Sequence, residues 1–276
     1  MTILIDVIAL CLGLAFGSFA NVIIFRNGVI KSNLTTRSTC LQCHYPISPR
    51  DNIPVISWLI LRGKCRNCHA PISRVYPLVE IATAILFLLF INAPDHVFES
   101  VGTPSFLARA AILVGLLWLA VAGVALAVID FRDFVLPNRL VYSTFAVGIF
   151  SFLVASLSVG DVSALLRAML GSSISFLGFG LIARLAPKGL GLGDVKLAAV
   201  LGLYLGWFGW GALISGWLFA FFSASVFGII QILRRRAKIR SAIAFGPWML
   251  LGSFLSLFWG NSIWAIYMNF LQQVMG

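Results

Sequence analysis

Charged residues are scarce in this chain. They make up 11% of its 276 residues, whereas soluble domains average roughly 25%. Hydrophobic residues make up 60%, and the mean hydropathy is +1.00. These two departures exclude an ordinary soluble protein and indicate one that is embedded in a membrane.

The hydrophobic residues are arranged in long apolar segments. A transmembrane helix needs about 20 predominantly apolar residues, and eight segments approach or reach this length. They are residues 3–25, 78–93, 107–129, 139–158, 164–186, 195–210, 211–233 and 247–272. The second and sixth are short, and the boundary between the sixth and seventh is not defined by the sequence. We therefore expect an all-α polytopic membrane protein with about eight transmembrane helices.

Basic residues are almost absent from every second loop. Of the 20 lysines and arginines, 18 lie in residues 26–77, 130–139, 184–196 and 234–240, and only Arg109 and Arg167 lie on the other side. Short loops rich in lysine and arginine remain in the cytoplasm. The net charge of +11 therefore indicates topology rather than nucleic-acid binding. The four basic loops are predicted to be cytoplasmic, and both termini are predicted to lie outside the cytoplasm.

The first apolar segment lacks a charged n-region, and no small-residue cleavage site follows it. A removable secretory signal peptide has both features. We therefore expect residues 1–25 to form a retained transmembrane helix.

Cysteines are few, and four of the five lie in one predicted cytoplasmic loop. They form two C-x2-C pairs separated by 21 residues: Cys40, Cys43, Cys65 and Cys68. Because the cytoplasm keeps thiols reduced, disulfides are not expected there. Two such pairs can present four thiolates in a tetrahedron, which suits a structural zinc ion. We predict that zinc folds residues 26–77, since this loop has too few apolar side chains to form a core alone.

The remaining cysteine and two nearby histidines are not expected to be ligands. Cys11 stands alone in an apolar run and is predicted to be a small buried side chain. His44 and His69 each follow a cysteine pair, but four sulfur atoms already fill a structural site. We interpret both histidines as bystanders.

Acidic residues number only nine, and two of them lie at the edges of apolar segments. Asp130 ends the run 107–129, and Asp194 follows the glycine-rich turn 189–193. The basic loops place both at the cytoplasmic side. Carboxylates beside hydrocarbon are costly and are usually paired, buried or functional. If the two carboxyl groups meet, they can share a proton, activate water and protonate the leaving amine of a peptide, as an aspartyl hydrolase does.

Each acid also has a purely structural interpretation. Asp194 could cap the following helix, and Asp130 could pair at the membrane surface with an arginine of the same loop. Asp133 lies nearer to the loop and ranks third as a catalytic candidate. Lys196 could bind substrate or influence Asp194, or it could simply extend toward the headgroups.

Further motifs accompany the acids and cysteines in a fixed order. They are Gly17-Ser18-Phe19-Ala20-Asn21-Val22 with Arg26, Asn52-Ile53-Pro54, Ser57-Trp58-Leu59, Gly63-Lys64-Cys65, Tyr76-Pro77-Leu78-Val79-Glu80, Pro137 after Asp130, Gly191-Leu192-Gly193-Asp194 with Lys196, and Phe245-Gly246-Pro247. Together they resemble the prepilin peptidase family, membrane aspartyl proteases that process type IV prepilins and the pseudopilins of type II secretion. The resemblance covers nearly the whole chain. One departure is Asn138, where the family commonly has aspartate.

The resemblance implies a bifunctional enzyme of the bacterial inner membrane. Asp130 and Asp194 would be the catalytic pair, and cleavage would fall after a glycine, between a basic cytoplasmic leader and an apolar helix. The new amino terminus would then be methylated with S-adenosylmethionine, since relatives with the four-cysteine loop usually have both activities. Glu80 would bind the terminal amine or the methyl donor, or would pair with a nearby arginine. Gly63 and Lys64 are further candidates for methylation.

The expected organisation is a first transmembrane helix (1–25), a cytoplasmic zinc-binding loop domain (26–77) and a transmembrane aspartyl protease core (78–276). Both termini would be periplasmic. Three alternatives remain: a peptidase without methyltransferase activity, a cation- or proton-coupled transporter whose aspartates carry ions, and a membrane scaffold whose zinc loop docks a secretion partner. The sequence does not indicate which pilins or pseudopilins are processed, or the oligomeric state.

Overall fold

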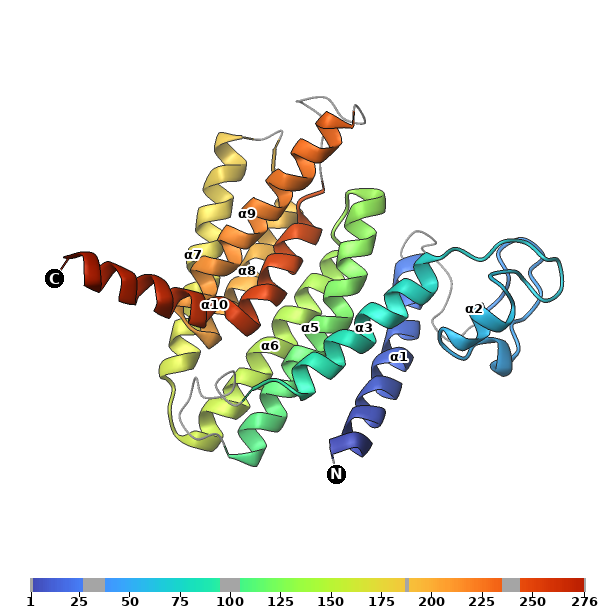
Figure 1. Ribbon diagram of the computed structural model, residues 1–276, viewed down its shortest axis with the longest axis horizontal. Coiled ribbons are helices and arrows are strands. Elements are labelled where there is room, and N and C mark those ends of the chain that lie inside the picture. Colours follow the sequence, from blue (N-terminus) through green and yellow to red (C-terminus); the bar gives the residue numbers. More distant parts are fainter. Residues whose placement is uncertain (1, 27–37, 95–104, 187–188, 235–243, 276) are drawn as a thin grey trace. The chain divides into compact units, whose positions relative to one another are not determined.

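The computed structural model describes residues 2–26, 38–94, 105–186, 189–234 and 244–275 (Figure 1). Within these residues every regular element is a helix, apart from two isolated β-bridges, so the all-α class is confirmed. The chain divides into two compact units, Met1–Asn92 with Ala120–Ala125, and Ala93–Leu119 with Leu126–Gly276. Residues 27–37 and 235–240, which carry part of the predicted basic loops, lie outside the described residues.

Two apolar helices pack together in the first unit. α1 (Thr2–Arg26) and α3 (Val75–Ile91) run antiparallel and side by side (Figure 1). A Cβ atom on Gly13 or Gly17 would lie 2.5 or 2.6 Å from a Cα atom of α3, so these glycines permit the close approach. Small residues four apart are typical of helices that pack in lipid. Cys11 on α1 is exposed, so the prediction of a buried side chain is wrong.

The four-cysteine loop connects α1 to α3 and contains the short helices η1 (Pro49–Asp51) and α2 (Ile56–Ile60). Its two cysteine pairs lie in two equivalent turns. In each turn the N–H of the first cysteine donates to a carbonyl five residues later, and the histidine N–H donates to the carbonyl of that cysteine. His44 and His69 have φ angles of 54° and 56°. Each histidine therefore closes its turn through the backbone.

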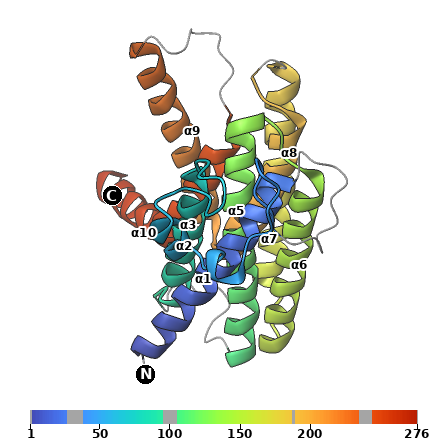
Figure 2. The same ribbon diagram turned by 90° about the vertical axis from the view of Figure 1, so that its right-hand side faces the viewer.

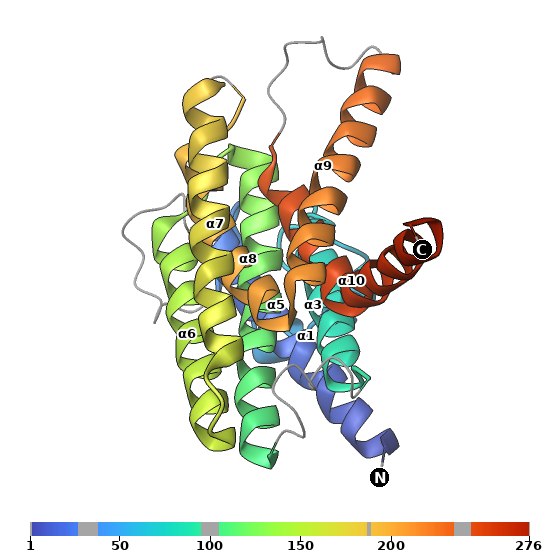
Figure 3. The ribbon, with the colours of Figure 1, turned by 90° about the vertical axis from the view of Figure 1, so that its left-hand side faces the viewer.

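In the second unit the described residues form the helices α5 (Phe106–Asp133), α6 (Asn138–Val159), α7 (Ser163–Leu185), α8 (Leu192–Phe208), α9 (Trp210–Leu233) and α10 (Gly246–Met275). α6 and α7 form a hairpin through Gly160, whose φ of 76° suits glycine (Figure 2). α8 contacts α6, α7, α9 and α10 (Figure 3). Twelve of its 17 residues are buried, which makes α8 the central helix.

Close backbone contacts and one buried tyrosine hold α8 in place. A Cβ atom on Gly171 of α7 would lie 2.6 Å from the carbonyl oxygen of Gly202, and the converse distance is also 2.6 Å. The hydroxyl of Tyr204 lies 3.2 Å from the carbonyl oxygens of Gly115 and Thr144. Tyr204 therefore ties α8 to both α5 and α6.

Among the described residues, six helices are long and apolar enough to cross a membrane: α1, α5, α6, α7, α9 and α10. α3 and α8 have only 17 residues each. These eight helices coincide with the eight predicted apolar segments to within a few residues. The boundary that the sequence left undefined falls at Gly209, whose φ of 139° ends α8 and begins α9.

Candidate active site and metal centre

Asp130 lies in the last turn of α5 and is only 5% exposed. Its Oδ2 accepts a hydrogen bond from the backbone N–H of Gly246, the first residue of α10, at 3.0 Å. α5 ends where Phe134 adopts a left-handed φ of 54° and donates its N–H to the carbonyl of Asp130. The N-terminus of a helix carries partial positive charge. The start of α10 therefore stabilises a carboxylate at this position.

Asp194 lies in the first turn of α8. Its Oδ2 accepts a hydrogen bond from the N–H of Gly191 at 2.9 Å. This bond satisfies one of the backbone donors that a helix N-terminus leaves unpaired. The N-cap residue itself is Gly191, not Asp194, but Asp194 still caps the helix through its side chain from the third helical position, which is compatible with a chemical role.

Leu136 connects the surroundings of the two acids. A Cβ atom on Gly193 would lie 3.2 Å from Leu136 Cβ, and one on Gly246 would lie 3.5 Å from Leu136 Cδ2. The neighbours of Asp194 and of Asp130 therefore contact the same side chain. The two carboxyl groups are also close enough to interact electrostatically. The fold thus brings together two acids that are 64 positions apart in the chain.

Neighbouring carboxyl groups cannot both ionise readily, so such a pair titrates as a unit and retains one proton over part of the pH range. A carboxylate beside a carboxylic acid can perform general base and general acid catalysis together. Asp133, the third candidate, is exposed at the end of α5. It lacks the burial that distinguishes Asp130.

Lys196 contacts α6 rather than extending freely toward the headgroups. Its Nζ donates to Asn138 Oδ1 at 2.9 Å and lies 5.7 Å from the centre of the Tyr142 ring. These contacts tie α8 to the first turns of α6, directly after the turn that contains Leu136. Asn138 therefore supplies an uncharged acceptor for Lys196.

The four cysteines form a candidate metal centre. Their Sγ atoms all lie within 4.8 Å of one another, and the Sγ atoms of Cys40 and Cys68 are 3.8 Å apart. Zn–S bonds of about 2.3 Å in a tetrahedron place sulfur atoms about 3.8 Å apart. The arrangement therefore fits a four-thiolate zinc site.

Backbone N–H groups favour the thiolate form at this centre. The pKa of the Cys40 thiol is lowered chiefly by the N–H of Cys43 and then by that of Gln42. The pKa of the Cys43 thiol is lowered chiefly by the N–H of Tyr45. Because the thiolate is the form that binds metals, the first turn prepares its two ligands. At Cys68 a backbone N–H bond is outweighed by burial and the neighbouring thiols, which raise the pKa of this thiol to about 11.

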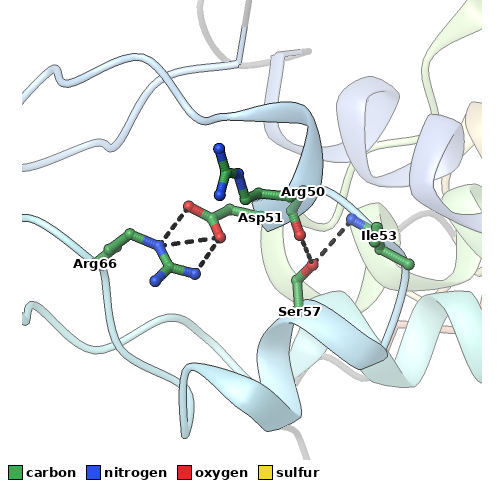
Figure 4. Close-up of polar contacts among 5 residues, drawn as sticks. All are labelled: Arg50, Asp51, Ile53, Ser57 and Arg66. Atoms are coloured by element: carbon green, nitrogen blue, oxygen red, sulfur yellow. Dashed lines mark hydrogen bonds and ion pairs between the residues drawn. The ribbon is translucent and has the colours of Figure 1, made fainter.

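Polar contacts outside the sulfur cluster shape the loop (Figure 4). The Arg66 guanidinium donates to both carboxylate oxygens of Asp51 at 2.6–3.1 Å. The hydroxyl of Ser57 accepts from the N–H of Ile53 and donates to the carbonyl of Arg50, both at 2.9 Å. The segment between the two cysteine pairs is therefore folded by its own hydrogen bonds.

Gly63 and Lys64 lie at the base of the second cysteine turn. A Cβ atom on Gly63, which has a φ of 67°, would lie 2.9 Å from Trp58 Cζ2. The indole N–H of Trp58 donates to the carbonyl of Ile72 at 3.2 Å. Lys64 forms an isolated β-bridge with Pro71. The described contacts of both residues therefore shape the loop.

Glu80 links α3 to the cysteine loop. Its Oε2 accepts from the N–H of Val55 at 2.7 Å, and its Oε1 accepts from Asn21 Nδ2 at 3.4 Å. Val55 has φ 61° and ψ −51°, and the N–H of Ile56 donates to the carbonyl of Pro54 at 2.6 Å. This is a γ-turn of the rare, strained type, and a β-branched residue seldom has positive φ. In the part of the chain that the structure describes, no arginine is among the partners of Glu80, and its carboxylate holds a strained turn in place.

The sequence does not predict the contributions of three residues to these sites: Gly246, Leu136 and Val55. Gly246 belongs to the motif Phe245-Gly246-Pro247, but the sequence does not predict that it donates a hydrogen bond to Asp130. The available signal was Pro247, because proline favours the first helical position and so marks the start of α10. No local signal identifies Leu136 as the shared neighbour. None predicts positive φ at Val55, since valine is among the residues least suited to it.

Two family models match this chain. Residues 11–93 match the Bacterial Peptidase A24 N-terminal domain, and residues 116–233 match the Type IV leader peptidase family. The first range contains the four clustered cysteines. The second contains Asp130 and Asp194.

Curated relatives named prepilin leader peptidase/N-methyltransferase match the chain over most of its length. One from Aeromonas salmonicida (strain A449) is 33% identical and covers 86% of this chain and 76% of its own length. Those from Stutzerimonas stutzeri and Bacillus subtilis (strain 168) are each 30% identical and cover 96% and 93% of this chain and 94% and 95% of their own lengths. No solved structure matches the chain. With its acid pair and its cysteine cluster both inside the matched ranges, the chain belongs to the type IV leader peptidase family.

Proposed function

We propose that this protein is a prepilin leader peptidase that also N-methylates the shortened pilin. The single observation that carries the proposal is the meeting of Asp130 and Asp194, at the ends of α5 and α8, around Leu136. The substrate is a type IV prepilin or type II secretion pseudopilin. The bond cleaved follows a glycine, between the basic leader and the apolar helix.

The acid pair hydrolyses this bond with one water molecule. One carboxylate removes a proton from water while the water oxygen attacks the glycine carbonyl carbon. The other residue, as a carboxylic acid, protonates the leaving nitrogen when the C–N bond breaks. The products are a leader with a terminal carboxylate and a pilin with a free terminal amine. The Gly246 N–H orients the Asp130 carboxyl group throughout.

Gly246→Ala is predicted to slow cleavage about 100-fold, because misplacing a catalytic group by about 1 Å has an effect of that size. A Cβ atom at this position would lie 2.7 Å from Asp130 Oδ2, so the carboxyl group must move. Gly178→Ala on α7 is the matched control, since a Cβ atom there meets nothing within 4 Å. Initial cleavage rates of purified variants measure the effect. Equal rates for the two variants would contradict the assigned geometry.

The methylation half of the proposal rests on acceptors between α1 and α3. Asn21 Oδ1 is buried and has no hydrogen-bond partner among the described residues, and it belongs to the amide that contacts Glu80. An unpaired buried acceptor costs about 1–3 kcal/mol, so a cationic donor would be stabilised here. S-adenosylmethionine, when bound, supplies an electrophilic methyl group for the terminal amine. Glu80 is proposed to bind one of these cationic groups, and Gly63 and Lys64 to support it through the loop.

Glu80→Gln is predicted to raise the KM for S-adenosylmethionine or for the amine about tenfold or more, the factor that corresponds to losing one charge-assisted contact of about 1.4 kcal/mol. The amide retains an acceptor for the Val55 N–H, so the loop should keep its metal. Kinetics of methyl transfer to a pre-cleaved pilin, together with metal analysis, make the test. Parallel loss of metal and methylation would instead assign Glu80 a purely structural role.

The proposal also includes a topology. α3 and α8 complete eight transmembrane helices, both termini are periplasmic, and the cysteine loop is cytoplasmic and holds zinc. The domains are the helix 1–25, the zinc loop 26–77 and the protease core 78–276. In support, α8 is central and mostly buried, as a helix surrounded by others can be even where it is short.

The proposed function is tested by incubating the purified protein with a prepilin, with and without S-adenosylmethionine. Mass spectrometry should show loss of the leader in both cases and a gain of one methylene mass only with the methyl donor. Cleavage without methylation would indicate a peptidase that lacks methyltransferase activity. Intact prepilin, combined with proton or cation flux in liposomes, would favour the transporter instead.

A further inference from the structure

The last turns of α10 leave the bundle of the second unit. In Figures 1 and 3 they run sideways, away from α7 and α8. Ser256, Leu257 and Gly260 are still buried, whereas residues 261–274 are almost all exposed. We call residues 261–274 the tail helix.

The first turn of the tail helix, which we call its root, is fixed by contacts of Asn261 and Trp264 with α8 and α9. Asn261 Nδ2 donates to the carbonyl of Phe208 at 2.8 Å, and its Oδ1 accepts from the N–H of Ala212 at 3.1 Å. One side chain therefore caps the end of α8 and the start of α9. Gly211 lets Trp264 approach closely, because a Cβ atom on it would lie 2.6 Å from that of the tryptophan. The sideways direction thus starts from a defined anchor.

The tail helix has an apolar and a polar face. Large exposed apolar side chains recur every three or four residues, as in Ile263, Ile266, Phe270 and Val274, which places them on one face of a helix. The polar side chains are Asn261, Ser262, Asn269, Gln272 and Gln273. With 3.6 residues per turn, these five fall within an arc of about 120°. Its centre lies about 140–160° around the helix from Ile263 and Val274, about 120° from Phe270 and only about 80° from Ile266.

The chemistry of both faces matches a neutral interface between water and lipid. Ile266, Phe270 and Val274 are 69%, 59% and 66% exposed, and nothing in the described residues covers them. Residues 246–275 contain no charged side chain, so attraction to a charged partner is excluded as a cause of binding. Trp264 and Tyr267 are of the type that concentrates at membrane interfaces.

The start of the tail helix also lies at the depth expected for the boundary between lipid headgroups and acyl chains. Arg167 donates to the carbonyls of Gly206 and Trp207 at 2.9 and 2.7 Å, so the end of α8 is level with Arg167. This arginine follows the start of α7 at Ser163 by four residues, or about 6 Å of helix. The tail helix therefore emerges a few ångströms below the end of the bundle. Interfacial helices lie about 5–10 Å into the boundary between headgroups and acyl chains.

We propose that the tail helix lies flat in the leaflet at the end of the bundle opposite the acid pair, with Phe270 and Val274 among the acyl chains and Asn269 and Gln272 at the headgroups. The occupant of its apolar face is the bilayer itself, bound through apolar area. This inference needs an embedded bundle but does not depend on the proposed catalytic activity.

The test places a fluorescent unnatural amino acid at position 274 of the full-length protein in phosphatidylcholine vesicles. Lipid brominated on the upper acyl chain should quench the probe at least about threefold more than aqueous iodide does. The same probe at position 269 should show the reverse preference. Iodide quenching at both positions would place the helix in water, and lipid quenching at both would make it part of a span. Protection from both quenchers would indicate a second copy; each of these three results overturns the proposal.

Two matched substitutions extend the test, with the probe at position 274. Phe270→Glu puts a charge on the apolar face and should shift the probe toward iodide. Asn269→Glu puts the same charge on the polar face and should leave the quenching unchanged. Metal content and prepilin cleavage monitor folding in both variants. If the two substitutions act alike, the assigned faces are wrong.

Discussion

Replacing Asp194 by asparagine is expected to lower prepilin cleavage by about 10³-fold or more, the scale on which a general acid or base contributes. Asparagine has nearly the same shape and can still accept the Gly191 N–H bond of the wild-type helix cap. It cannot gain or lose a proton. The variant therefore separates the chemical role of this position from its capping role. The measurement is the initial rate of leader release from purified prepilin.

Asp130→Asn should reduce cleavage to a similar extent, and the double variant should lose little more. Groups that act as a unit give strongly non-additive losses. Asp133→Asn is the matched control, because it removes a carboxylate from the same turn at an exposed position. The three single variants, at positions 130, 133 and 194, should keep the metal content of the wild type. Normal processing of prepilin by Asp194→Asn would end the assignment of the acid pair.

Replacing Cys65 by serine is expected to reduce bound zinc from one ion per chain to a small fraction. A hydroxyl group is a far poorer zinc ligand than a thiolate. Because metal binding and folding are coupled in such small loops, residues 38–74 should also become sensitive to limited proteolysis. Metal analysis and protease digestion measure the two effects.

Cys11→Ser provides the control for the zinc experiment. Cys11 is exposed on α1 and is not one of the four clustered thiols, so zinc and loop protection should be unchanged. The hydrogen bonds of Asp51, Ser57 and Trp58 should also remain in Cys11→Ser. If Cys65→Ser retained a full complement of zinc and an intact loop, the four-thiolate site would be wrong.

The cysteine cluster shows how much local spacing can predict. Each C-x2-C pair forms one tight turn, and the two turns repeat the same backbone hydrogen bonds. Residue type and spacing therefore suffice to predict four converging thiols. The turn also explains the histidines, whose positive φ angles serve the backbone, while their side chains are not needed as ligands.

The acid pair needed information of another kind. The positions of Asp130 and Asp194 at the ends of apolar segments followed from the chain alone, and so did their shared side by the charge rule. The shared neighbour Leu136 could not be predicted from the chain, because it depends on how α5, α8 and α10 pack. The outcome for Glu80 is similar. The sequence left open whether Glu80 binds the terminal amine, binds the methyl donor or pairs with an arginine, whereas the structure adds a contact with the strained turn at Val55.

The amino-acid sequence by itself determined that this protein is helical and membrane-embedded, that four cysteines converge in one cluster, and which two acids form the candidate catalytic pair. These properties follow from composition, apolar length and the spacing of nearby residues. Only the tertiary structure decided that Gly246 and Leu136 complete the acid site, that Asn261 and Arg167 cap a short central helix, and that the end of α10 turns away from the bundle. Such contacts join residues distant in the chain, and their free energy depends on helix packing, which no local pattern encodes.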